Sequence, residues 1–100
     1  MNFLKYDLQL ADGDAVEVTL DGRANVRLMD ASNFADYKAG RRHRYYGGLA
    51  KQSPVRISAP HAGRWVLTID LGGRPGRVKA SVKTLSSASS GPPTAVARPA

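Results

Sequence analysis

Residues 3–10 read Phe-Leu-Lys-Tyr-Asp-Leu-Gln-Leu, and this stretch sets the expected fold. Leu4, Tyr6, Leu8 and Leu10 occupy every second position, with mostly polar residues between them. A period of two places these four side chains on one face of a β-strand. The same interruptions are incompatible with a signal peptide, which needs an unbroken apolar run of roughly 7–15 residues. We therefore expect the chain to open with a half-buried strand.

The alternation recurs along the chain and predicts further strands at about 16–21, 24–29, 41–50, 55–59, 65–71 and 77–83. Residues expected to face inward are Val16, Val18, Leu20, Val26, Leu28, Val55, Ile57, Ala59, Trp65, Leu67, Ile69, Leu71, Val78, Ala80 and Val82. Short strands separated by Gly, Pro and Asp turns are typical of a sandwich or a barrel. The expected fold is all-β, a small antiparallel β-sandwich of jelly-roll-like architecture. Its core should centre on Trp65, Leu67 and Ile69.

One segment, from Asp30 to Gly40, breaks the alternation. Ser32 could cap a short helix, and Phe34 and Tyr37 are spaced to share one helix face. A glycine at position 40 could end the helix. We expect one short helical element of one or two turns across the end of the sandwich, with a plain loop as the alternative.

The folded domain is expected to span residues 1–85. Residues 86–100 are rich in Ser, Pro and Ala, lack an apolar face, and are predicted to be a disordered tail. There is no cysteine, which excludes disulfides and thiolate metal sites and fits a reducing compartment. No apolar stretch approaches the ~18 residues that span a bilayer. A cytoplasmic location is therefore expected.

The net charge of +7 is divided unevenly. Residues 1–37 contain three basic and seven acidic residues, whereas residues 38–100 contain twelve basic residues and a single acidic one, Asp70. Such asymmetry suggests an anionic partner for the basic part, or self-association through opposite patches. The alternative is a solvated surface whose charge serves no recognition.

The basic residues interleave with aromatic ones in one stretch. The candidate binding residues are Arg41, Arg42, Arg44, Tyr45 and Tyr46, extended by Lys79 and Lys83 if the two strands that carry them pair. Arginine and tyrosine together could neutralise phosphates and stack on bases. Alternatively, strand alternation buries one of the two tyrosines and the arginines are only solvated. A third interpretation docks this stretch on Asp12, Asp14 and Asp21 of a second copy.

Catalytic and metal-binding patterns are weak. His61 lies in a turn near Ser58, but no motif supplies an orienting group or an oxyanion hole, so His61 is expected to brace the turn. Asp12 and Asp14 flank Gly13 as turn residues usually do, and calcium requires six to eight oxygen ligands. We expect neither catalytic residues, nor a metal, nor a cofactor.

Three further features could serve a ligand. The loop 72–76, Gly-Gly-Arg-Pro-Gly, could cradle an anion with backbone amides and Arg74, although a structural hairpin loop is the simpler interpretation. Asn25 lies beside Arg27 on the polar face of its strand. Asn33 could equally close the turn at the start of the helix.

Several motifs resemble the bacterial family of unknown function called DUF1883. They are Asn2-Phe-Leu-Lys-Tyr-Asp7, Asn25-Val-Arg-Leu-Met-Asp30, Asn33-Phe34, Tyr37-Lys38, Arg44-Tyr-Tyr-Gly-Gly48, Ser53-Pro54, Pro60-His61-x-Gly63-x-Trp65 and Ile69-Asp-Leu-Gly-Gly73. The resemblance covers residues 1 to about 85. It implies a small β-sandwich that occurs alone or joined to other modules, including Toll/interleukin-receptor-like signalling domains. It implies no agreed activity and no catalytic residues.

Together these patterns favour a non-catalytic protein-interaction, accessory or sensor module whose partner is another protein or a second copy. Binding of nucleic acid or another polyanion is the first alternative, and binding of a glycan or small ligand is the second.

Overall fold

The computed structural model describes residues 3–86 and confirms a small antiparallel β-sandwich with one helix. The elements are β1 (Phe3–Leu10), β2 (Ala15–Leu20), β3 (Ala24–Met29), α1 (Ala31–Lys38), β4 (Tyr46–Ala50), β5 (Val55–Ser58), β6 (Gly63–Asp70) and β7 (Ala80–Leu85). The expected tail, apart from its first residue, lies outside the described residues.

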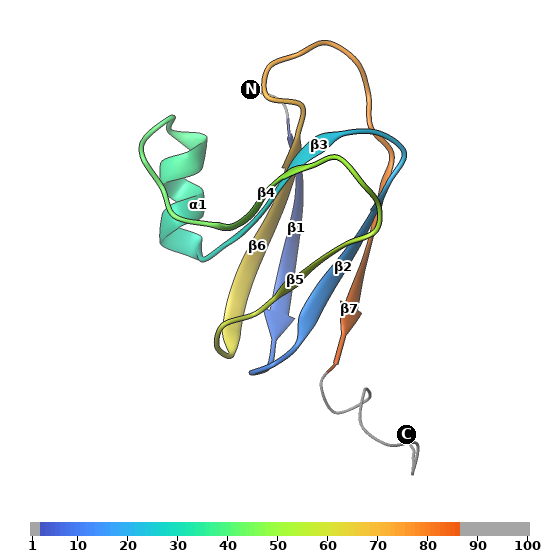
Figure 1. The fold of residues 1–100 in the computed structure, drawn as a ribbon. Helices are drawn as coiled ribbons and strands as arrows, with labels where there is room; N and C mark the ends of the chain where they lie inside the picture. Colours follow the sequence, from blue (N-terminus) through green and yellow to red (C-terminus); the bar gives the residue numbers. More distant parts are fainter. Residues whose placement is uncertain (1–2, 87–100) are drawn as a thin grey trace.

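Two sheets form the sandwich (Figure 1). One has the strand order β1-β6-β3-β4, and the other has the order β5-β2-β7. All the strand pairs are antiparallel. The long loop 71–79 joins β6 to β7 and crosses from the first sheet to the second at the end where β1 begins (Figure 1).

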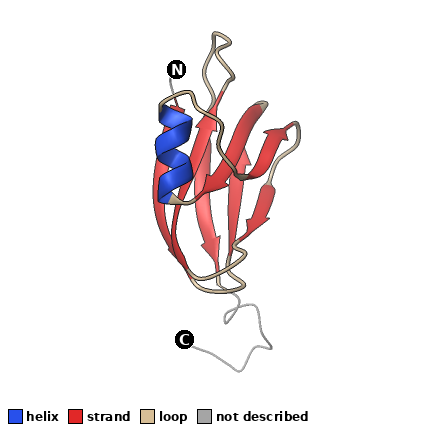
Figure 2. Ribbon diagram, turned by 90° about the vertical axis from the view of Figure 1, so that its left-hand side faces the viewer, coloured by secondary structure: helices blue, strands red, loops and turns tan. Residues whose placement is uncertain are grey.

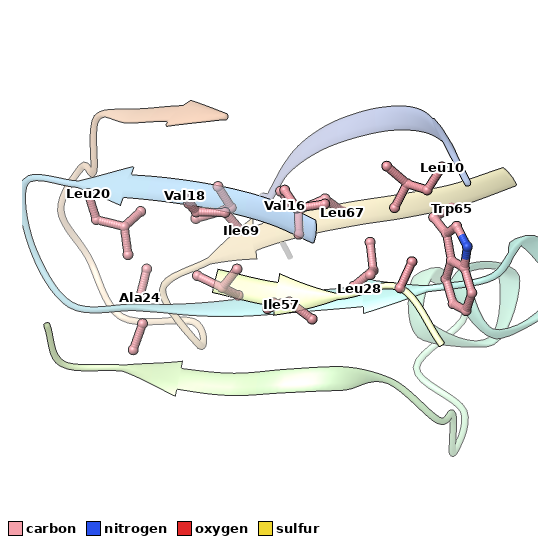
Figure 3. Packing of buried hydrophobic residues seen from close by; sticks show 13 residues of the cluster. Leu10, Val16, Val18, Leu20, Ala24, Leu28, Ile57, Trp65, Leu67 and Ile69 are labelled. Carbon is pink, nitrogen blue, oxygen red and sulfur yellow. The ribbon is translucent and has the colours of Figure 1, made fainter. Parts of the chain in front are cut away.

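The main core lies between the two sheets (Figure 3). Trp65, Leu67 and Ile69 of β6 are at most 3% exposed, which confirms the expected centre of the core. Val16 and Val18 of β2 face them from the other sheet and are fully buried (Figure 3). Burial of an aliphatic side chain of this size stabilises the fold by roughly 1.5–3 kcal/mol, so the inward faces of β2, β3 and β6 dominate its stability.

The outer face of the four-stranded sheet is covered as well, which the alternation did not predict. Helix α1 lies against this face rather than across the end of the sandwich (Figure 2). Phe34 and Tyr37 of the helix pack on Met29 and Val66 in a second apolar cluster. Phe3 joins this cluster from the face of β1 that was expected to be polar.

The helix begins differently from the expectation. Asp30, not Ser32, is the N-cap, and its Oδ1 accepts a hydrogen bond of 2.9 Å from the backbone N–H of Asn33. Ser32 only donates its hydroxyl to the same oxygen of Asp30. Asp30 takes the cap position because it is the single residue between the end of β3 at Met29 and the start of α1 at Ala31.

The predicted strand at 41–50 is too long, because residues 41–45 form a loop and β4 begins only at Tyr46. Gly47 and Gly48 have positive φ angles of 112° and 145°. A Cβ on Gly47 would clash with the carbonyl oxygen of Val26. The register of β4 with β3 is nevertheless continuous: Tyr46 lies opposite the buried Leu28, and its ring lies 6.0 Å from that of Trp65. Tyr45 precedes the strand, so alternation does not apply to it. Both Tyr45 and Tyr46 are exposed.

Candidate functional site

A buried carboxylate organises the outer face of the four-stranded sheet. Asp70, at the end of β6, is 2% exposed. Its Oδ2 accepts from the Arg27 guanidinium at 2.6 Å and from the Tyr37 hydroxyl at 2.7 Å. Its Oδ1 accepts from Asn25 Nδ2 at 2.9 Å and from the backbone N–H of Gly72 at 2.8 Å. These five residues are called the Asp70 network below.

Arg27 is held between aromatic rings as well as by its ion pair. Its guanidinium carbon lies 5.7 Å from the ring centroid of Tyr37 and 5.0 Å from that of Tyr45. His43 completes the cluster, with its ring 5.2 Å from Tyr37 and 5.5 Å from Tyr45. Arg27 Nε and His43 Nε2 are buried without a hydrogen-bond partner among residues 3–86. Buried polar atoms of this kind usually bind an ordered water.

The network sets the ionisation of its members. Burial raises the pKa of Asp70, but hydrogen bonds from Asn25, Tyr37 and the Gly72 N–H, with the charge of Arg27, outweigh burial. The pKa of Asp70 therefore lies below its ordinary value, and the side chain is a carboxylate. Burial and the hydrogen bond to Asp70 raise the pKa of Tyr37 to about 12, so Tyr37 remains a neutral donor.

The interactions of the Asp70 network hold parts of the fold together. Both carboxylate oxygens are engaged by two donors each, which leaves Asp70 with little capacity to act as a base. The donors come from β3, from α1 and from the loop after β6, so the network attaches the helix and the 71–79 loop to the sheet. A signal for Asp70 was present in the sequence, since it is the one acidic residue after position 37. Its partners are distant in sequence and could not be read from it.

The residues of the predicted basic stretch are largely exposed, and Tyr45 contacts Arg27 of the Asp70 network. Arg41 is paired with Asp36 at 3.0 Å, whereas Arg42 and Arg44 form no ion pair among the described residues. Tyr45 and Tyr46 are 41% and 48% exposed, and Leu49 on β4 is 54% exposed. We call the set Arg42, Arg44, Tyr45, Tyr46 and Leu49 the β4 surface. Leu49, which lies opposite Asn25 of β3, is a member that sequence reasoning did not identify.

The strand pairing that would have extended this stretch through Lys79 and Lys83 does not occur. Strand β7, which carries Lys83 and follows Lys79, pairs with β2 in the other sheet, whereas β4 pairs with β3. Lys79 donates its backbone N–H to Asp21 at 2.7 Å, and Lys83 lies opposite Glu17. Within the described residues, the candidate basic residues are therefore divided between the β4 side of the first sheet and the β7 side of the second.

The remaining candidates have local structural contacts. Asp14 is buried and accepts from the backbone N–H of Ala11, and Asp21 binds the backbone of Lys79, so neither is a free acidic group for a second copy. His61 contacts the carbonyl of Ala62 through Nδ1 at 3.0 Å and packs 4.9 Å from the Trp65 ring. These contacts agree with the expected bracing of the turn.

Asn25 and Asn33 also have structural partners. Asn25 belongs to the Asp70 network. Asn33 donates its side-chain amide to Asp30 at 2.9 Å and accepts from the backbone N–H of Arg44 at 2.7 Å. Within residues 3–86, no group of three or more potential ligands could hold a metal ion. No helix of that part of the chain is long and apolar enough to cross a membrane.

The fold and the network define a class: a small two-sheet β-sandwich with a helix fastened to its outer face by a buried carboxylate. The family model described as Domain of unknown function (DUF1883) matches residues 1–88. The chain belongs to this family. All the members of the Asp70 network lie within the motifs that carry the resemblance. The chain has no match among curated proteins or among solved structures.

Proposed function

We propose that this domain is a non-catalytic interaction module and that it contacts a partner protein through the β4 surface. The observation that supports this proposal most strongly is the exposure of large apolar side chains. Tyr45, Tyr46 and Leu49 are three of the four exposed large hydrophobic residues in the described chain, and they lie within five positions of one another. Solvent-exposed tyrosine beside arginine is typical of the residues that dominate protein interfaces.

The position of the β4 surface also supports contact with a partner. Strand β4 is an edge of its sheet, so one side of its backbone lacks a neighbouring strand in that sheet. Tyr45 is held in place by Arg27, which reduces the entropy lost when a partner covers it. Arg42 and Arg44 favour a partner with an acidic segment, because no acidic side chain among the described residues pairs with them.

Site-specific photo-crosslinking in source cells would test the proposal. A photoreactive phenylalanine analogue at position 49 of the full chain should give a defined protein adduct, and an analogue at position 83 on β7 should not. The adduct at position 49 should be lost when Arg42 and Arg44 are both replaced by Glu. The matched control, Lys79→Glu with Lys83→Glu, makes the same charge change on the other sheet and should retain it. Equal adducts from both positions would contradict the proposal.

A titration of the full chain with nucleic acid would test the alternative that the partner is a polyanion. The division of the basic residues between two sheets makes a continuous phosphate-binding track less favourable. Labelled single- and double-stranded nucleic acid should therefore not bind at ~50 mM salt. Binding that weakens steeply as salt rises would instead favour a polyanion partner.

A second copy as the partner would appear in light scattering against concentration. A mass that rises with concentration, and that falls again in the Arg42→Glu/Arg44→Glu variant, would identify the partner as the chain itself.

A further inference from the structure

A pocket of about 760 Å³ opens at the end of the sandwich where β1 begins and the 71–79 loop crosses between the sheets. This volume falls within the range of small-molecule sites, roughly 300–1,000 Å³. The apolar residues that line the pocket come from β1, from β6 and from the 71–79 loop. They are Phe3, Leu4, Ile69, Leu71, Pro75 and Val78. Leu4 was expected to be buried, but it is 41% exposed because it lines this opening.

The charged side chains of the pocket that have no ion-pair partner among the described residues are positive. The charged residues of the lining are Asp70, Arg74 and Arg77. Asp70 is engaged on both oxygens by the Asp70 network, and its charge is balanced by Arg27. Arg74 donates Nε to the carbonyl of Leu71 at 3.2 Å. Neither Arg74 nor Arg77 forms an ion pair within residues 3–86.

The loop that carries the two arginines is fastened at both ends. At its start, the Gly72 N–H binds Asp70, and the Arg74 N–H binds the carbonyl of Leu71 at 3.3 Å. At its end, Lys79 and Asp21 exchange two hydrogen bonds, of 2.7 Å through the Asp21 side chain and 3.2 Å between the backbones. The two sheets are therefore bridged by a tethered loop, and the pocket exists before any ligand enters.

We propose that this pocket binds a single-chain aliphatic carboxylate, with the chain between the paired ends of β1 and β6 and the 71–79 loop, and the carboxylate at Arg74 and Arg77. An apolar pocket with a few convergent polar groups is the usual form of a small-ligand site. The planar guanidinium group matches a carboxylate with two parallel hydrogen bonds. The lining includes no lysine and no helix residue of the kind that often binds phosphate. This site is separate from the β4 surface, and its ligand is a small molecule rather than a protein.

Titration of the full chain with dodecanoate, below the concentration at which it forms micelles, tests the proposal. Amide NMR signals of residues 3–4 and 69–78 should shift on saturation. Dodecanol keeps the chain but lacks the charge, and acetate keeps the charge but lacks the chain. Each should bind at least about tenfold more weakly than dodecanoate, because each loses one of the two contributions. Equal affinity for dodecanol and dodecanoate would overturn the role of the arginines. Tighter binding of dodecyl phosphate would overturn the assignment of a carboxylate.

Two matched pairs of variants locate the site. Arg74→Gln with Arg77→Gln should raise the dissociation constant for dodecanoate about tenfold or more, whereas Arg42→Gln with Arg44→Gln should leave it unchanged. Leu4→Asn should weaken binding, and Leu49→Asn, at an exposed leucine outside the pocket, should not. All the substituted side chains are exposed, so each variant is expected to keep its fold. Circular dichroism would check this. Unchanged binding in the Arg74/Arg77 variant, or shifts confined to other residues, would refute the proposal.

Discussion

At the scale of single residues, the buried carboxylate of Asp70 has the largest set of interactions described above. Four donors from three segments of the chain meet at one buried carboxylate. An aspartate on the most buried strand would destabilise the sheet if it were alone, because a buried charge needs a partner and hydrogen bonds. With this set of donors it becomes the point where strand, helix and loop are joined.

Replacing Asp70 by Asn should lower the free energy of unfolding by about 3 kcal/mol, since Arg27 is left as a partly buried cation without its counter-ion. The amide would also direct a donor at other donors. Chemical denaturation measures the change. Asp36→Asn is the matched control, because its ion pair with Arg41 is exposed and should contribute less than about 1 kcal/mol. Equal effects of the two substitutions would show that the Asp70 network does not stabilise the fold.

Gly47 is required by space and by backbone conformation. In Gly47→Ala the new Cβ would approach the carbonyl oxygen of Val26 and the Cδ1 of Ile57, at a φ of +112°. We expect a loss of about 3 kcal/mol in the free energy of unfolding, from strain and overpacking together. Gly22→Ala, where nothing lies within 4 Å, should change stability by well under about 1 kcal/mol. Thermal denaturation of both variants would separate the two cases.

At the scale of elements, the position of the short helix α1 depends on the residues at its two ends and on the face that contacts the sheet. Asp30 caps the start, and Lys38 lies in the last turn, where a cation is favourable. Phe34 and Tyr37 face the sheet and form the contacts that fix the helix on it. A helix of eight residues is too short to be stable alone. Its existence therefore depends on packing against β6.

Asp30→Ala should destabilise the domain by about 1 kcal/mol through loss of the N-cap. Ser32→Ala should cost clearly less, because the Ser32 hydroxyl donates only to Asp30 on the surface. Amide hydrogen exchange across 31–38 would report the local loss, and denaturation would report the global one. A larger effect at Ser32 than at Asp30 would contradict the observed cap.

At the scale of the whole molecule, stability should depend on pH at both extremes. The backbone N–H of Asn33 lowers the pKa of Asp30, and the Asp70 network lowers that of Asp70. Their contributions are complete above the ordinary value of 3.8 and are lost as pH falls through the lower folded-state values. The pKa of Tyr37 is raised, so its contribution is complete below pH 10.0 and is lost as pH rises toward 12.

Denaturation curves measured from pH 2 to pH 12 would test this dependence. Asp30→Ala should flatten the acid limb, and Tyr37→Phe should flatten the alkaline limb between pH 10.0 and 12. Tyr6→Phe is the matched control for the alkaline limb, since Tyr6 packs against the main core from β1, away from the Asp70 network. An alkaline limb that survives in Tyr37→Phe would assign it to another group.

The strand pattern and the main core were predictable from sequence because they depend on local alternation. Trp65, Leu67 and Ile69 are buried as expected, and β2 and β3 occur within a residue of the predicted positions. The same logic failed at residues 41–45, which form a loop, so that Tyr45 lies outside the strand and Tyr46, the first residue of the edge strand β4, is 48% exposed. It also failed on the outer faces of β1 and β6, since alternation cannot show that a helix covers the second face of a sheet.

The sequence by itself determined the class of fold, the centre of the core, the family and the exposed basic stretch, because each depends on neighbouring residues or on motifs. Only the tertiary structure decided which distant groups meet. It brought Asn25, Arg27 and Tyr37 to Asp70, separated Lys79 and Lys83 from the β4 surface, and opened the pocket between β1 and the 71–79 loop. The physical reason is that alternation specifies the faces of each strand but not the order in which strands pair.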